Sequence, residues 1–223
     1  MTTGPLALVG GGEWAESCAV FDRTLLEQSG ATEVVVLPTG AAYEQPQRVI
    51  DQATGFFESL GVKARGLLVL GRTDAQADEH AAAVRDARFV YLAGSSALHL
   101  RSVLKESAVW DALLHAWNNG AAVAGSSAGA MVLCDPMVDP RGGAFTLGLG
   151  LLEQMAAIPH FDEWSAEKAH RVFQLAPASV PVVSIHTHSA LLRAPDGTWS
   201  TAGEGAVEVF VDGKKAGLEA LPG

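Results

Sequence analysis

The 223-residue chain is long enough to bury a full hydrophobic core, and α/β sheets covered by helices often reach this size as one domain. Hydrophobic residues make up 48% of it and charged residues 18%, a balance typical of a compact globular protein rather than a disordered one. The formal net charge is −10, and no run rich in Lys and Arg offers a surface for a phosphate backbone. We therefore expect one domain over residues 1–223, with no nucleic-acid partner.

The cysteine content and the first residues of the chain indicate in which cellular compartment the protein is expected. Two cysteines, Cys18 and Cys134, make no disulfide framework, which favours a reducing environment. The chain starts with Met1 and runs directly into a short apolar segment, without a basic region and a cleavage site. No apolar run approaches the roughly 18 residues of a membrane span. These features predict a cytoplasmic protein with no membrane partner.

Short apolar runs alternate with segments of helical periodicity along the chain. The expected strands are Leu6–Val9, Glu33–Leu37, Gly66–Leu70, Phe89–Leu92, Ala121–Ala124 and Val180–Ile185. The expected helices are Glu16–Gln28, Gln45–Leu60, Ala75–Ala87, Ala97–Lys105, Val109–Asn118 and Ala166–Gln174. This alternation predicts a three-layer α/β fold, with a doubly wound, mostly parallel sheet between helices. The alternating segment Trp199–Val211, interrupted by Gly203 and Gly205, predicts a small antiparallel hairpin at the sheet edge.

Small and reactive residues follow the expected strands. The segments are Gly10–Gly12, Pro38–Gly40, Ala93–Ser96, Gly125–Ser127 and His186–His188. Ligands of open parallel sheets bind at the carboxyl ends of the strands, so a functional site is expected at this edge.

The segment Ala121–Leu133 reads as a buried strand followed at once by a helix, and it contains Gly125-Ser-Ser-Ala-Gly129. This is the G-x-S-x-G pattern of a nucleophile on a sharp strand-to-helix turn. The two glycines are needed because larger residues would collide across the turn. Such a turn presents the Ser127 hydroxyl and places the Ala128 N–H and the helix N-terminus where an oxyanion develops. A Gly/Ser-rich turn without chemistry is the alternative interpretation of five residues alone.

A serine hydroxyl needs a base, so one of the seven histidines should lie beside Ser127. Four of them, at positions 80, 99, 115 and 170, fall inside expected helices. His160 follows Pro159 in an irregular segment and is the best candidate.

At this point the sequence resembles the dipeptidase E and cyanophycinase group of serine peptidases, over nearly the whole chain. The matching segments are Leu8–Glu13, Val34–Thr39, the Gly94 loop, the elbow Gly125–Met131, Gly148–Leu152 and Ile158–Phe161. The resemblance implies a fold like that of the class I glutamine amidotransferases, which is also flavodoxin-like in layout. It implies peptide hydrolysis without a cofactor, often at aspartyl residues.

The resemblance also assigns site residues. Ser127 matches the nucleophile and His160 the base, while Ala128 and the loop of Gly94 and Ser95 match the oxyanion hole. The Gly94 loop departs from the family, where Asn or Asp usually follows the glycines and this chain has Ser95 and Ser96. An acid, often Glu, is replaced by Thr187. The third triad member of dipeptidase E aligns with Asp135, or with Asp139 if the loop is placed differently.

Two other segments have features of a metal site or a dinucleotide-binding site. His186 and His188 share one face of an extended segment and with His160 could form a three-histidine metal site, but no carboxylate or cysteine cluster accompanies them. Substrate contact or polar filling at the sheet edge is the expected role of both histidines, and Ser96 is a further candidate for substrate contact. Gly10–Gly12 lacks the spacing of a dinucleotide-binding loop.

The sequence thus predicts a serine peptidase acting on a small peptide or amide, with Ser127, His160 and Asp135 as catalytic residues. A non-catalytic ligand-binding protein and an acyl or amide transferase stay open as alternatives. For the oligomeric state, a monomer and a homodimer are both compatible with apolar edge strands.

Overall fold

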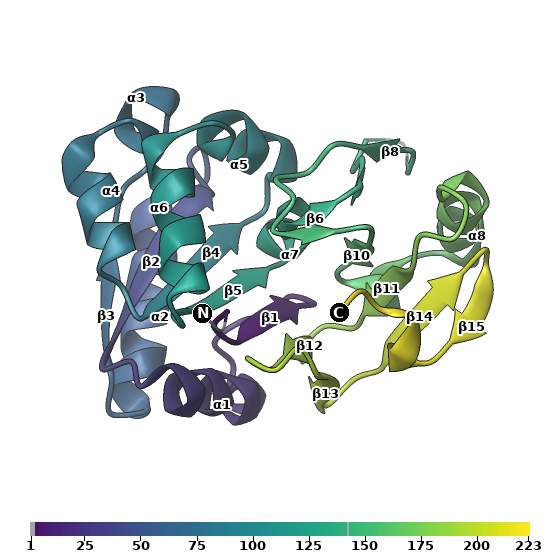
Figure 1. Ribbon diagram of the computed structural model, residues 1–223, viewed down its shortest axis with the longest axis horizontal. Helices are drawn as coiled ribbons and strands as arrows, with labels where there is room; N and C mark the ends of the chain where they lie inside the picture. Colours follow the sequence, from purple (N-terminus) through teal and green to yellow (C-terminus); the bar gives the residue numbers. More distant parts are fainter. Residues whose placement is uncertain (1–2, 142) are drawn as a thin grey trace.

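The protein, described here by a computed structural model that covers residues 3–141 and 143–223, is built on two β-sheets (Figure 1). The larger sheet has seven strands. In spatial order these are β13 (Trp199–Gly203), β12 (Ser189–Arg193), β1 (Leu6–Val9), β5 (Ala122–Ser126), β4 (Phe89–Gly94), β2 (Glu33–Gly40) and β3 (Lys63–Gly66). The five strands from β1 to β3 are parallel, and β12 and β13 are antiparallel at one edge. The expected mostly parallel α/β sheet is confirmed.

Helices cover both faces of this sheet. They are α1 (Ala19–Ser29), α2 (Pro46–Ser59), α3 (Arg72–Ala75), α4 (Asp78–Arg85), α5 (Ala97–Leu104), α6 (Ala108–Asn118) and α7 (Ala128–Leu133). Side chains alternate across a strand, so each strand contributes to two cores. Leu8 of β1 packs in the core with α4 to α7, whereas Val9 packs in the core with α1 and α2. Three layers result.

A second sheet of four strands was not predicted from the sequence. Its spatial order is β10 (Ala156–Ile158), β11 (Val182–Ile185), β14 (Val207–Val211) and β15 (Lys214–Ala216), and α8 (Ala166–Leu175) lies on its outer side (Figure 1). β10 and β11 are parallel, and the other pairs are antiparallel. The expected strand over Val180–Ile185 therefore exists as β11, but it belongs to this sheet.

The hairpin expected over Trp199–Val211 is wrong. β13 pairs with β12 in the larger sheet, whereas β14 pairs with β11 in the smaller one. The chain changes sheets after Gly203, which lies at φ 108 and where an added Cβ would lie 2.3 Å from the His188 carbonyl oxygen, so no side chain would fit. The antiparallel pair at the edge of the larger sheet is β12 with β13 instead.

Two other expected boundaries are corrected. Gly66–Leu70 is not a strand: β3 is the polar edge segment Lys63–Gly66, because its place is fixed by backbone pairing with β2 rather than by apolar side chains. The expected helix Ala75–Ala87 is interrupted after Ala75, giving α3 and α4.

The remaining elements are short. They are two-stranded pairs, β6 (Cys134–Asp135) with β9 (Leu152–Glu153) and β7 (Met137–Val138) with β8 (Phe145–Thr146), and the 3-10 turns η1 (Glu16–Cys18), η2 (Phe161–Glu163) and η3 (Leu218–Ala220). Within the described ranges, no helix has the length and apolarity needed to cross a bilayer.

Candidate active site

Ser127 lies between the end of β5 and the start of α7, at the carboxyl edge of the larger sheet. Its backbone is at φ 53 and ψ −114, a conformation that non-glycine residues rarely adopt and that marks strained functional turns. Ser127 is half-buried, whereas the preceding Ser126 is fully buried and donates to Glu13 Oε2 at 2.7 Å. Of the two adjacent serines, Ser127 is therefore the one that a ligand can reach.

The glycines of the elbow are required by close backbone approaches. A Cβ on Gly125 would lie 2.6 Å from the backbone carbon of Gly129, directly across the turn. A Cβ on Gly129 would lie 2.4 Å from the carbonyl oxygen of Leu92 in β4. Both separations are shorter than any van der Waals contact, so the G-x-S-x-G spacing follows from the packing of this turn against its neighbours.

His160 follows β10, in the smaller sheet, and its ring reaches Ser127. The His160 Nε2 atom lies 3.1 Å from the Ser127 Oγ, within hydrogen-bond range. His160 itself is at φ 51, and 32% of its side chain is exposed. The structure thus brings together the two residues that the sequence singled out, although they come from different sheets.

The carboxyl end of β1 holds both of them in place. Three successive carbonyl groups, of the last residue of this strand and the two glycines after it, accept backbone hydrogen bonds from three different segments. The bonds run from Ser127 N to Val9 O at 3.0 Å, from His160 N to Gly10 O at 2.7 Å and from His188 N to Gly11 O at 2.9 Å. β1 therefore lines up the elbow, the His160 loop and the connection between β11 and β12.

The glycines after β1 also make room for the imidazole rings. A Cβ on Gly11, which has φ 115, would lie 2.0 Å from His160 Cε1, and a Cβ on Gly12 would lie 2.3 Å from His188 Cδ2. The spacing of these glycines argues against a dinucleotide site, but their role in accommodating the imidazole rings was not predicted from the sequence. Three consecutive glycines at the end of a strand were the available signal.

Two backbone N–H groups are candidates for an oxyanion hole. Ala128 N–H opens α7, and Ser95 N–H follows β4, which runs parallel to β5 with Leu92 opposite Gly125. Neither N–H has a hydrogen-bond partner among the residues that the structure describes. Gly94, at φ 118, packs so tightly against Gly40 that a side chain would not fit there. The Gly94 loop therefore lies beside the elbow, as expected.

Thr187 and Asp162 are the nearest groups on the far side of His160. Thr187 Oγ1 lies 3.4 Å from His160 Nδ1 and donates to Asp162 Oδ1 at 3.1 Å. The backbone N–H of Thr187 donates to the same oxygen at 2.8 Å. Glu163 Oε1 is 3.5 Å from His160 Nδ1, with 67% of the Glu163 side chain exposed.

Asp135 does not reach His160. Its Oδ1 accepts a hydrogen bond from Gly148 N at 2.9 Å and so ties down the loop before β9. Asp139, the alternative, pairs with Arg141 at 2.6 Å, which lowers the pKa of Asp139 to about 2. The expectation that either acid orients His160 is corrected by this geometry: both carboxylates have local partners.

The other expected contacts lie around the site rather than at its centre. Ser96 caps α5, accepting from His99 N at 3.4 Å. The His186 ring stacks on Phe161 with centroids 6.3 Å apart, and the His188 ring lies against Gly12. Over residues 3–141 and 143–223 there is no group of three or more side chains able to hold a metal, so the three-histidine site is not formed.

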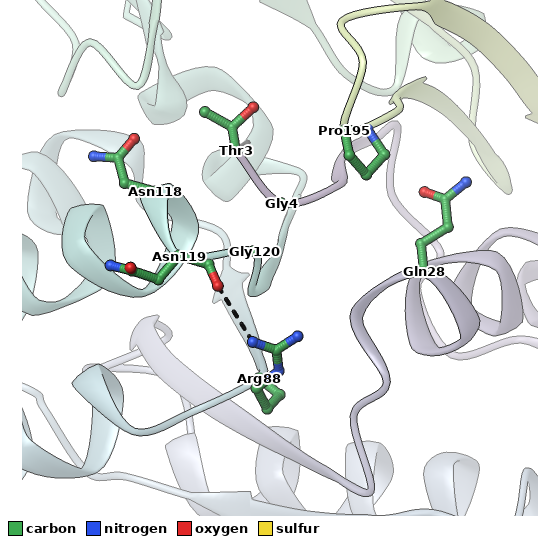
Figure 2. A pocket seen from close by; sticks show the side chains of 8 residues that line it. All are labelled: Thr3, Gly4, Gln28, Arg88, Asn118, Asn119, Gly120 and Pro195. Carbon is green, nitrogen blue, oxygen red and sulfur yellow. Dashed lines mark hydrogen bonds between the residues drawn. The ribbon is translucent and has the colours of Figure 1, made fainter. Parts of the chain in front are cut away.

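Two hollows in the surface lie at different distances from the carboxyl edge of the larger sheet. Figure 2 shows one of about 410 Å³ lined by residues that include Gly4, Arg88 and Gly120. These three precede β1, β4 and β5, so that hollow lies at the amino ends of the strands, away from Ser127. A second hollow, of about 340 Å³, includes Gly12, which lies against the His188 ring. It is lined by Gly12, Glu13, Trp14, Asp51, Gln52, Gly55 and Phe56.

Comparison with known proteins gives a consistent result. Residues 6–199 match the model of peptidase family S51. A cyanophycinase of Synechococcus elongatus is 24% identical over 219 residues, covering 92% of this chain and 67% of that protein. A peptidase from an acI-B1 Actinobacterium superposes with a TM-score of 0.86 at 27% identity, covering 96% of this chain and 93% of the other.

A putative peptidase E of Listeria monocytogenes EGD-e shares the fold, with a TM-score of 0.70 at 18% identity over 91% of this chain and 100% of the other. Because the family model covers most of the sequence, from β1 to the start of β13, the chain belongs to peptidase family S51, a family of serine peptidases.

Proposed function

We propose that the protein hydrolyses peptide bonds with Ser127 as the nucleophile and His160 as the general base. The observation that carries the proposal is the 3.1 Å separation of Ser127 Oγ and His160 Nε2 at a strained elbow. A serine hydroxyl becomes an effective nucleophile when an imidazole nitrogen takes its proton.

The reaction follows from the positions of these groups. Ser127 Oγ attacks the scissile carbonyl carbon while its proton moves to His160 Nε2. The carbonyl oxygen becomes negative, and the N–H groups of Ala128 and Ser95 are the donors that can stabilise it. His160 then gives the proton to the leaving amine, and a water molecule activated by His160 releases the acyl group from Ser127. No cofactor takes part in this scheme.

We propose small peptides as substrates, with aspartyl and isoaspartyl bonds as the first candidates because of the resemblance to dipeptidase E and cyanophycinase. The hollow beside Gly12 carries two carboxylates, Glu13 and Asp51, which would repel an acidic side chain. A substrate panel should therefore pair aspartyl and isoaspartyl dipeptides with neutral and basic ones of equal length.

Labelling with a small sulfonyl fluoride tests the nucleophile. We expect one adduct, which peptide mapping places on Ser127, and hydrolysis that falls by at least about three orders of magnitude in Ser127→Ala and in His160→Ala. The exposed Ser179, changed to alanine, is the matched control and should leave both unchanged. An inert Ser127 in the folded wild-type protein would refute the proposal and leave a ligand-binding role. An acyl-enzyme captured more readily by an amine than by water would point to a transferase.

A further inference from the structure

The inference concerns the group that orients the base, and it rests on the proposed function. For His160 Nε2 to accept the Ser127 proton, the neutral ring must carry its own proton on Nδ1, and that N–H needs an acceptor. In many members of the resembling family a carboxylate stands where this chain has Thr187. Thr187 has no charge, so it cannot replace the acid alone.

The hydrogen bonds around Thr187 fix the direction of its hydroxyl. An ionised carboxylate can only accept hydrogen bonds, so the bond of 3.1 Å between Thr187 Oγ1 and Asp162 Oδ1 uses the single hydroxyl proton. A lone pair of the same oxygen is left for His160 Nδ1, at 3.4 Å. This distance is long, but hydrogen bonds of a free enzyme's catalytic groups often shorten when substrate binds.

Asp162 and Thr187 are joined by two hydrogen bonds, both to Asp162 Oδ1. That oxygen also accepts the Thr187 backbone N–H at 2.8 Å, so Asp162 fixes the residue as well as its hydroxyl. Although partial burial raises it, the pKa of Asp162 lies below its usual value, because both Thr187 donors and the nearby His186 favour the carboxylate. Asp162 thus remains an acceptor through the neutral pH range.

Glu163 is the competing acceptor. Its carboxylate is 3.5 Å from His160 Nδ1, but a mostly exposed glutamate loses side-chain entropy when held in one place and its charge is screened by water. The Thr187 hydroxyl, by contrast, lies on the short connection between β11 and β12, whose backbone is fixed by hydrogen bonds at His186 and His188.

We propose that Thr187 and Asp162 act together as the positioning group of His160. The Thr187 hydroxyl oxygen accepts a hydrogen bond from the Nδ1–H group of His160, and Asp162 holds that hydroxyl in the accepting orientation. Because one hydroxyl separates the carboxylate from the ring and Asp162 is exposed, the pair should contribute less than a buried acid in direct contact with the base.

The first experiment compares kcat/KM in Asp162→Asn, Thr187→Val and Thr187→Ser. The asparagine amide can donate to Thr187 Oγ1 and let the hydroxyl proton turn toward Nδ1, which favours the wrong tautomer. We expect kcat/KM to fall about 10- to 100-fold in Asp162→Asn and Thr187→Val, less than the roughly 10⁴-fold seen when a directly contacting acid is changed. Thr187→Ser, which keeps the hydroxyl, should stay within about threefold of the wild type.

Glu167→Gln, which removes a negative charge from an exposed position of α8, is the control and should leave kcat/KM unchanged.

Nitrogen-15 NMR of the histidine rings gives a readout that needs no substrate. The wild type should show His160 with its proton on Nδ1, and Asp162→Asn should increase the other tautomer. The proposal is overturned if both variants keep wild-type kcat/KM and tautomer, or if the loss appears only in Glu163→Gln. Failure of the proposed function would look different: the wild type would neither be labelled at Ser127 nor hydrolyse any peptide, while the tautomer measurement would still test the pair.

Discussion

At the scale of single residues, the site depends on a glycine that leaves room for the imidazole ring of the base. The imidazole of His160 occupies the space that a Cβ on Gly11 would fill, because that atom would lie 2.0 Å from the ring. The positive φ of Gly11 adds strain for any other residue. The distance between nucleophile and base is thus set by a residue that has no side chain.

Replacing Gly11 by alanine should therefore impair catalysis more than folding. The methyl group would push the His160 ring away from Ser127, and a displacement of about 1 Å can cost about 100-fold in rate. We expect kcat/KM and the rate of Ser127 labelling to fall by about that factor. Gly61→Ala is the matched control, since Gly61 also has a positive φ, 79, but no atom within 4 Å of the added methyl group. Equal activity in the two variants would contradict this account.

At the scale of elements, α1 carries an unusual buried acid. Asp22 is fully buried, and neither of its carboxylate oxygens has a hydrogen-bond partner among the described residues. Burial raises the pKa of Asp22 well above its usual value, and the negative charge of Glu13 raises it further. Folding therefore favours the protonated form of Asp22 relative to the unfolded chain.

This difference predicts how stability depends on pH. Because the folded-state pKa is the higher one, the contribution of Asp22 to stability is fully present below the unfolded pKa and is lost as the pH rises through the folded value. Asp22→Asn has no such loss, so its free energy of unfolding should exceed that of the wild type at pH 8 by on the order of 1 kcal/mol. The excess should disappear near pH 4.

Urea unfolding at both pH values measures this difference. Asp111→Asn, on the exposed side of α6, is the control and should show no such pH-dependent gain. Parallel pH dependence in Asp22→Asn and the wild type would show that Asp22 stays ionised in the folded state.

At the scale of the whole molecule, nucleophile and base lie on different sheets. Ser127 follows β5 of the seven-stranded sheet, and His160 follows β10 of the four-stranded sheet. One hydrophobic core contains residues of both sheets, among them Leu8 and Val123 of the larger and Ile158 and Val183 of the smaller. Packing between the sheets therefore maintains the distance between the reacting groups.

A change inside the smaller sheet tests how strongly the two are coupled. Val183 is fully buried in β11, and Val183→Ala should destabilise its surroundings by about 1–3 kcal/mol. Strands of the smaller sheet are short, so we expect hydrogen exchange to accelerate in β10 and β11 and much less in β4 and β5. Mass spectrometry of peptic fragments measures this. Equal acceleration in both sheets would show that they open as one cooperative unit.

What the sequence predicted and what it missed follow from distance along the chain. The elbow is local: strand, glycines, serine and helix occupy consecutive positions, so its conformation can be derived from steric requirements. The parallel sheet was also predictable, because apolar runs alternate with helical segments along the chain. His160 was found by its irregular setting and by resemblance, and the structure places it beside Ser127.

The smaller sheet and the surroundings of His160 were not predictable in this way. β10 has three residues, too few for a periodic pattern. β13 and β14 follow one another closely and so resembled one hairpin, but β13 pairs with β12, and β14 pairs with β11 and β15. Thr187 and Asp162 are 25 residues apart and meet only because β11 returns alongside β10. Asp135 was expected to be the third catalytic residue because it aligns with that residue of dipeptidase E, but its carboxylate binds the backbone N–H of Gly148.

The connection between β11 and β12 has one further consequence. His186 N donates to Ala206 O at 3.0 Å and His188 N donates to Gly11 O at 2.9 Å, so the main chain on either side of position 187 is anchored independently of the side chain there. The side chain at position 187 can therefore change while the backbone keeps its conformation. A single amino-acid replacement could supply a hydroxyl, a carboxylate or neither to the imidazole without remodelling the scaffold, which gives evolution a simple means of adjusting turnover.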